Sequence, residues 1–305
     1  MTASAANSVQ GHGVSLITPF NETGEVDYPA LERLTTSLTN SKVQFIVVLG
    51  HASEAALLEE DEQIRVMDFV SEINNGVKTL VGGVACTSTR NAIRRVSTFD
   101  RRDFSSIFCG SPAPSASTNS GFVGHYRSIA QASPLPIFMH HERALPGQSE
   151  WVLEMAHEKN ISGVIDETGS IELIDRWVQE RPDGFRLLSA RDSMALPLYA
   201  LGIDGAVSTI GNAFPDAFGE MIDLLAFGAM NDARVRHHEL APLMRIMENE
   251  GRPATTKSVL SHLNRCAPSV RLPNTPVTET TQQQVYRAIA ALPEHISSKL
   301  LSQSH

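Results

Sequence analysis

Short apolar runs alternate with longer amphipathic segments along most of the chain. Each run is followed by a polar turn and then by a segment with apolar residues at spacings of three and four, such as Leu31, Leu34 and Leu38. This alternation is typical of β/α units, in which helices cover a parallel sheet. The pattern predicts eight strands, at residues 14–18, 45–49, 79–85, 106–109, 137–140, 163–165, 185–189 and 205–208.

The pattern changes after Phe227. Three helical segments follow without strands, at residues 231–250, 255–264 and 279–291. We therefore expect two parts, a barrel over residues 1–228 and a C-terminal helical extension over residues 229–305 that packs on it.

Eight β/α units in roughly 220 residues favour a closed (β/α)8 TIM barrel, with the three-helix extension, over an open dinucleotide-binding sheet. The open sheet would place a glycine-rich turn directly after its first strand. The pair Gly82-Gly83 instead lies inside a predicted strand, where close packing explains it.

Charge and composition exclude several classes of function. The chain has 25 basic and 34 acidic residues, so its net charge of -9 does not suit nucleic-acid binding. The three cysteines, Cys86, Cys109 and Cys266, are too few for a disulfide scaffold. Residues 1–10 are small and polar and lack the basic and apolar regions of an export signal. No apolar stretch is long enough to span a membrane. We expect a cytoplasmic protein without a membrane or nucleic-acid partner.

Motifs in a characteristic order run nearly end to end. They include Thr18-Pro19-Phe20 after the first predicted strand, residues 50–54 after the second, Leu135-Pro136 before the fifth, residues 163–169 at the sixth and residues 202–208 at the eighth. They resemble the class I aldolases of the dihydrodipicolinate synthase and N-acetylneuraminate lyase family. The resemblance implies the same barrel with helical tail, and a dimer or tetramer of identical subunits.

The resemblance also implies that the family's chemistry is altered here. The family's Schiff-base lysine corresponds to Ile165, and an alkyl side chain cannot condense with a ketone. Of the five lysines, Lys42, Lys78 and Lys159 precede predicted strands, whereas Lys257 and Lys299 lie in the helical tail. We therefore expect no imine. The other changed positions are the family's tyrosine, now His140; its substrate-binding arginine, now Leu145; its threonine pair, now His51 and Ala52; and its tyrosine pair, now Ala113 and Pro114.

Without an imine, an aldolase-type reaction needs a metal or hydrogen-bond donors to stabilise the carbanion. His51, His140 and His141 all follow or end predicted strands at one end of the barrel. We predict His140 as a proton donor or acceptor and His51 as a donor to the developing oxyanion. A metal at His51 and His140 is the less favoured alternative, because adjacent His140 and His141 point to opposite faces of a strand. Its third ligand would have to be Asp166, Glu167, Glu142 or Cys109, and none of these has a spacing diagnostic of a metal site. We therefore expect no metal or other cofactor.

A carboxylated substrate would need groups to hold it. The candidates are the backbone amides of Ala52 and Ser53, the side chain of His141, and the guanidinium groups of Arg143 and Arg191. Surface ion pairs with Glu142 and Asp192 are the alternative role for the two arginines. Glu54 is expected to be structural.

Two functions remain open at this point. The first is a lyase or hydratase that acts without a Schiff base on a small carboxylate resembling a 2-oxo acid. The second is a catalytically inactive relative that binds or senses a small molecule.

Overall fold

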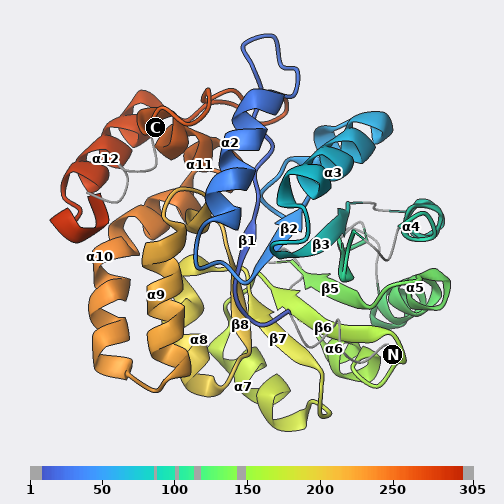
Figure 1. The fold of residues 1–305 in the computed structure, drawn as a ribbon. Coiled ribbons are helices and arrows are strands. Elements are labelled where there is room, and N and C mark those ends of the chain that lie inside the picture. Colours follow the sequence, from blue (N-terminus) through green and yellow to red (C-terminus); the bar gives the residue numbers. More distant parts are fainter. Residues whose placement is uncertain (1–8, 86–87, 100–102, 113–117, 143–148, 298–305) are drawn as a thin grey trace.

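The computed structural model describes residues 9–85, 88–99, 103–112, 118–142 and 149–297. Parallel strands in sequence order form a closed barrel, and helices surround it (Figure 1). Pairing of β8 with β1, from Gly11 opposite Gly205 to Val14 opposite Ser208, closes the barrel and confirms the predicted fold. The strands are β1 (Gly11–Ser15), β2 (Phe45–Val48), β3 (Thr79–Val84), β4 (Ser106–Cys109), β5 (Ile137–His141), β6 (Ile161–Asp166), β7 (Arg186–Ser189) and β8 (Gly205–Ser208).

Helices follow the strands and cover the outside of the barrel. Asp27 begins the first described helix, because its carboxylate accepts a hydrogen bond of 3.0 Å from the amide of Ala30. The helices around the barrel are α2 (Tyr28–Thr39), α3 (Glu60–Asn74), α4 (Thr89–Val96), α5 (Asn119–Ala132), α6 (Glu150–Met155), α7 (Ile171–Glu180), α8 (Ala195–Leu201) and α9 (Pro215–Ala226). Short 3-10 turns are η1 (Ala55–Leu57), η3 (Asp192–Met194) and η4 (Ile210–Asn212).

The C-terminal part forms the helices α10 (Met230–Asn249), α11 (Arg252–His262) and α12 (Glu279–Ala290). In Figure 1 α10 lies beside α9, whereas α11 and α12 pack on α10 and on each other. Helix α11 also contacts η4 at the end of β8. This contact brings α11 to the C-terminal end of the barrel, which we call the mouth. The division of the chain at residues 228 and 229 into two domains stays a prediction.

The first strand begins earlier than its apolar run predicts. Observed β1 is Gly11–Ser15, whereas the prediction was residues 14–18. His12 is buried and bonds to the Ser208 hydroxyl at 2.8 Å. A Cβ on Gly13 would come within 2.1 Å of the Phe45 ring. The strand is therefore built mainly from polar and small residues together with Val14, and the apolar Leu16 and Ile17 belong to the buried connection after it.

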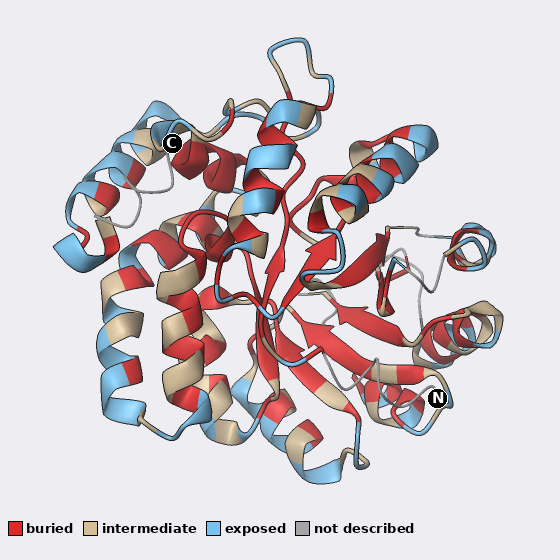
Figure 2. Ribbon diagram, viewed as in Figure 1, coloured by how far each residue is buried: buried red, intermediate tan, exposed pale blue. Residues whose placement is uncertain are grey.

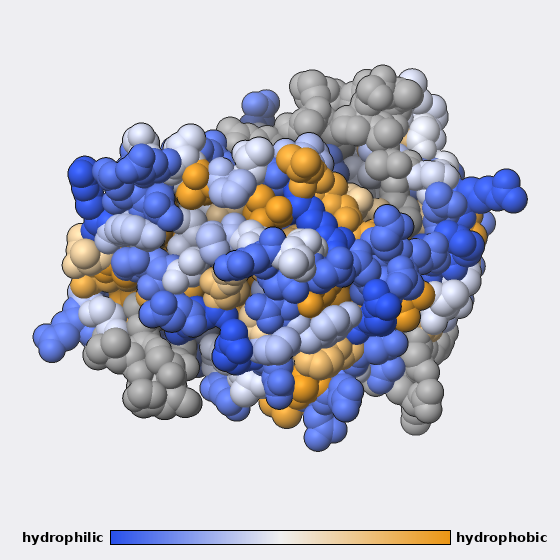
Figure 3. Space-filling view, turned by 90° about the horizontal axis from the view of Figure 1, so that it is seen from above, coloured by the Kyte–Doolittle hydropathy of each residue, from blue (hydrophilic) through white to orange (hydrophobic). Residues whose placement is uncertain are grey.

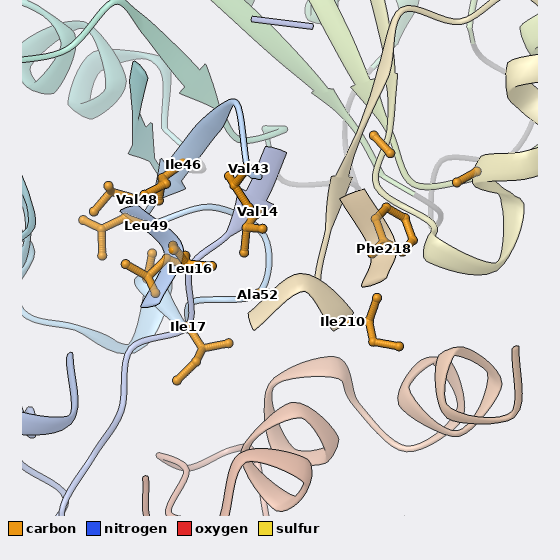
Figure 4. Close-up of a cluster of buried hydrophobic side chains, with 14 of the residues drawn as sticks. Val14, Leu16, Ile17, Val43, Ile46, Val48, Leu49, Ala52, Ile210 and Phe218 are labelled. Atoms are coloured by element: carbon orange, nitrogen blue, oxygen red, sulfur yellow. The ribbon is translucent and has the colours of Figure 1, made fainter. Parts of the chain in front are cut away.

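Apolar residues form an inner and an outer layer. On β2, Phe45 and Val47 point into the barrel, whereas Ile46 and Val48 pack outside it with residues of β1 and the last β/α unit (Figure 4). In Figure 2 the strands of the barrel are mostly buried, and the surrounding helices are buried along one side and exposed along the other. The inner cluster contains Val9, Phe45, Val47, Val81, Phe108, Phe138, Ile165, Leu188, Ala190 and Val207.

One face of the molecule is mostly polar. The face seen in Figure 3 is largely hydrophilic, and its hydrophobic residues lie in separate small patches. Within the described residues, no helix is both long and apolar enough to cross a membrane.

Candidate active site

His140 and His51 meet at the mouth of the barrel. His140 lies near the end of β5, and its ring centroid is 4.9 Å from that of Phe108 in the inner cluster. His51 follows β2, and its ring centroid lies 6.3 Å from that of His140. The structure therefore brings the two predicted catalytic residues together, at the end where barrels of this type hold their active sites.

His140 lies between two carboxylates. Its Nδ1 is 3.5 Å from Oε1 of Glu142, and its Nε2 is 3.5 Å from Oε1 of Glu167. Burial by itself would lower the pKa of His140, but the negative charges of Glu167 and Glu142 outweigh it and raise the pKa to about 9. The ring is therefore an imidazolium at neutral pH, and not the group titrating near pH 6.5 that the sequence suggested.

Glu167 joins the barrel to the C-terminal helices. It follows β6, and its backbone amide donates to the carbonyl of His141 at 2.9 Å. Its Oε1 also accepts a hydrogen bond of 2.7 Å from Nη1 of Arg252, the first residue of α11. Burial alone would raise the pKa of Glu167, but the charges of His140 and Arg252 hold it well below its usual range. The carboxylate is therefore ionised.

His51 has the opposite protonation state. Its Nε2 lies 3.3 Å from the hydroxyl of Thr209, and burial lowers its pKa to about 3. The amide of Thr209 in turn donates to the carboxylate of Asp192 at 3.1 Å, and burial raises the pKa of that carboxyl to about 7. The site thus pairs a cationic imidazole with a neutral one.

Ile165 lies inside the barrel next to these groups. It is the register partner of His140 in the pairing of β5 with β6, and it is fully buried in the inner cluster.

The described lysines lie elsewhere. Lys257 of α11 is buried with its Nζ 2.6 Å from the carboxylate of Glu54, as part of a structural network. Lys78 donates to the carbonyl of Ser41 at 2.7 Å. Lys42, Lys78 and Lys159 precede β2, β3 and β6, at the end of the barrel opposite the mouth.

A broad open groove lies at that opposite end. It runs past the starts of β3 and β6 and contains Lys78 and Lys159, but it contains neither His51 nor His140. Because titratable groups with opposed charges gather at the mouth, we place the candidate active site there and not in the groove.

Comparison with known proteins decides the family. The profile of the dihydrodipicolinate synthetase family matches residues 8–292. The chain belongs to this family of lyase-type enzymes. A 4-hydroxy-tetrahydrodipicolinate synthase of Azobacteroides pseudotrichonymphae genomovar. CFP2 is 33% identical over 285 residues, which cover 92% of this chain and 96% of the relative. The enzyme of the same name from Parabacteroides distasonis is 31% identical over 292 residues, with 93% and 97% covered.

Solved structures agree with this assignment. The 4-hydroxy-tetrahydrodipicolinate synthase of Methylacidiphilum fumariolicum SolV superposes with a TM-score of 0.90 at 25% identity, covering 97% of this chain and 99% of that chain. A second structure, described as the first monomeric dihydrodipicolinate synthase variant, has a TM-score of 0.87 at 25% identity, with 93% and 97% covered.

His141 does not face the mouth. It is fully buried on the outer side of β5, where its ring lies 5.8 Å from that of Trp151 and 5.1 Å from that of Trp177. Its Nδ1 is 2.8 Å from Oδ1 of Asp166. The alternation of side chains along a strand separates it from His140, so it is unsuited to the substrate-binding role expected for it.

The expected backbone cradle is occupied by the protein itself. The amide of Ala52 donates to the hydroxyl of Ser15 at 3.1 Å, and the amide of Ser53 donates to the carbonyl of Gly50 at 3.2 Å. Neither N–H is available for a carboxylate in this arrangement. Glu54 pairs with Lys257, so its position suits the structural role expected for it.

Arg191, one of the two predicted arginines, is held by other groups of the protein. Arg191 donates to Glu248 at 3.1 Å and to the carbonyl of Thr168 at 3.0 Å, so its ion-pair partner is Glu248 and not Asp192. Arg143 lies outside the described residues. A guanidinium that contacts the site is that of Arg252, which lies between the predicted helical segments 231–250 and 255–264 and was not among the predicted site residues.

A metal site is not apparent in the described part of the chain. No group of three or more His, Cys, Asp or Glu side chains there is placed to hold an ion. Of the proposed third ligands, Cys109 and Asp166 point to the outer side of their strands, whereas Glu142 and Glu167 flank His140 as charge partners.

Proposed function

We propose that the chain is a lyase or hydratase that acts, without a Schiff-base intermediate, on a small carboxylate resembling a 2-oxo acid. The observation that carries the proposal is the contact between the cationic His140 and the anionic Glu167 beside a hydrocarbon, Ile165. Family membership supports the lyase class, and the position of Ile165 supports chemistry without an imine.

The geometry suits acid–base catalysis by the side chains themselves. Breaking a bond next to a ketone leaves negative charge on the carbonyl oxygen, and an imidazolium can donate a proton or a hydrogen bond to that oxygen. His140 supplies this acid, and the carboxylate of Glu167 beside it stabilises the imidazolium. His51, which is neutral, is a hydrogen-bonding partner for the same oxygen.

The proposal is tested by chemical trapping and by turnover. Incubation with pyruvate, 2-oxobutyrate or 2-oxoglutarate and borohydride should leave the protein mass unchanged, and an adduct would overturn the proposal. In a screen of hydroxy and oxo acids, His140→Gln should lower turnover by 100-fold or more. His238→Gln, at an exposed position on α10, is the matched control and should retain full activity. An inactive binding protein would show ligand-induced thermal shifts without turnover in the wild type.

We also propose a cytoplasmic homodimer or homotetramer. Description of one related structure as the first monomeric variant implies that other members assemble. Light scattering after size-exclusion chromatography tests this, and a monomer across the concentration range would contradict it.

A further inference from the structure

We propose that Arg252 binds the carboxylate of the substrate. This inference rests on the proposed function and adds the group that holds and orients the ligand. It also gives the C-terminal helices a direct part in the site.

The first argument is the way Arg252 uses its donors. Only Nη1 is engaged by a side chain, at 2.7 Å from Oε1 of Glu167, and the remaining N–H groups have no hydrogen-bond acceptor among the described residues. A guanidinium offers five donors in a planar fork, and its free edge matches the two oxygens of a carboxylate. One edge of Arg252 can therefore hold Glu167 while the other holds a ligand.

The second argument is the place of Arg252 in its helix. It is the first residue of α11, after Gly251 in the left-handed region at φ +76° and before Pro253. The N-terminus of a helix carries partial positive charge, so a cation is disfavoured there. Helix stability therefore does not explain an arginine at this position, whereas the Glu167 carboxylate and an anionic ligand do.

The third argument is the charge around the neighbouring groups. Glu167 Oε1 is shared by Arg252 and by Nε2 of His140, which lies 3.5 Å away. Among the described residues, Nδ1 of His51 is buried without a hydrogen-bond partner, and Nε2 of His140 is buried with no contact closer than the 3.5 Å to Glu167. Such atoms are costly unless a ligand satisfies them. A 2-oxo acid held by its carboxylate at Arg252 would present its ketone oxygen toward these two imidazoles.

Other basic side chains of the described residues near the mouth form ion pairs with other carboxylates. Arg191 is paired with Glu248, and Lys257 is paired with Glu54. Arg271 forms a two-pronged ion pair with Glu62, with nitrogen to oxygen distances of 2.6 Å. Arg252 is the guanidinium of the described residues that contacts the His140 and Glu167 pair.

The experiment compares a charged ligand with an uncharged one. Calorimetric titration of the full chain with pyruvate and with pyruvamide measures the preference for a carboxylate. The wild type should prefer pyruvate at least tenfold. Arg252→Gln should weaken pyruvate binding roughly 10- to 100-fold, the loss expected for a charged hydrogen bond, and should change pyruvamide binding less than twofold. Arg252→Lys should restore part of the preference.

Controls separate binding from folding and from the proposed function. Arg245→Gln, at an exposed position on α10, should behave as the wild type. A purely structural Arg252 would lower the melting temperature of the variant but leave its carboxylate preference intact, and that result would overturn the inference. It is also overturned if the wild type shows no preference for pyruvate, 2-oxobutyrate or 2-oxoglutarate over the matching amide. If His140→Gln abolishes turnover while Arg252→Gln keeps the preference, the inference fails and the proposed function stands.

Discussion

His141 and Asp166 form a buried pair, with 2.8 Å between Nδ1 and Oδ1, on the outer side of β5 and β6. His140 lies on the inner side of β5. Asp166 also accepts hydrogen bonds from the hydroxyl of Thr168 and the amide of Gly169. The pair therefore fixes the ends of β5 and β6 relative to each other. His140 directly precedes His141, and Glu167 directly follows Asp166. The distance between His140 and Glu167 therefore depends on this outer contact.

Loss of the outer pair should destabilise the barrel. Asp166→Asn keeps the shape but removes the charge, and we expect it to lower the free energy of unfolding by about 1–3 kcal/mol. Urea denaturation measures this. Asp175→Asn, at an exposed position on α7, should change stability by less than about 0.5 kcal/mol. Equal stability of the two variants would contradict the role given to the pair.

His140 should titrate near pH 9. Its pKa in the folded protein is raised from 6.5 to about 9, so protonation favours the folded state. This contribution is complete below pH 6.5 and is lost as the pH rises through 9. NMR titration of the ring should show the raised pKa, and Glu167→Gln should lower it. A wild-type value near 6.5 would be inconsistent with the charge pair.

Asp192 should weaken the fold above neutral pH. Burial raises its pKa from 3.8 to about 7, so protonation favours the folded state; this contribution to stability is complete below pH 3.8 and is lost as the pH rises through 7. Asp192→Asn should therefore be more stable than the wild type at pH 8, by an amount of the order of 1 kcal/mol, and not at pH 4. Denaturation curves at the two pH values check this, and a gain that is independent of pH would argue against the titration.

Lys257 should be essential for stability. Its ammonium group is buried against the carboxylate of Glu54 and lies 3.9 Å from the centre of the Phe20 ring. Lys257→Met leaves the carboxylate unpaired and should cost about 3–5 kcal/mol of unfolding free energy. Lys159→Met, at an exposed site, is the control. Adding Glu54→Gln to Lys257→Met should recover part of the loss, and a neutral single variant would contradict the pair's importance.

Installing an amine at position 165 should create a site that forms an imine with a ketone. In Ile165→Lys the new side chain is surrounded by hydrocarbon, which lowers the pKa of a lysine and leaves it nucleophilic. Pyruvate and borohydride should then increase the mass of the variant but not that of the wild type. A folded variant without an adduct would show that position 165 lies out of reach of a bound ketone.

The barrel was accessible from the sequence because each β/α unit repeats one local pattern. Where the prediction differed, a tertiary contact decided: β1 contains His12 and Gly13 because Ser208 and Phe45 fill the space beside them. The prediction that His51 and His140 meet followed from their positions at strand ends.

The charges at the site were harder to predict. The raised pKa of His140 depends on Glu142 and Glu167 both lying within 3.5 Å, a geometry that spacing alone does not give. Arg252 lies 85 residues from Glu167 along the chain and reaches it only because α11 packs against η4. A cation at a helix start, where the dipole disfavours it, is the local signal that would have singled it out.

The inner cluster determines from which side protons enter. Phe45, Val81, Phe138 and Leu188 fill the barrel core with hydrocarbon, and each is at most 1% exposed. In the part of the chain that the structure describes, this hydrocarbon separates His140 from the opposite end of the barrel. If the proposed reaction takes place at the mouth, a proton on His140 would exchange with solvent from that side, and a bound substrate would slow the exchange of an isotopic label carried there.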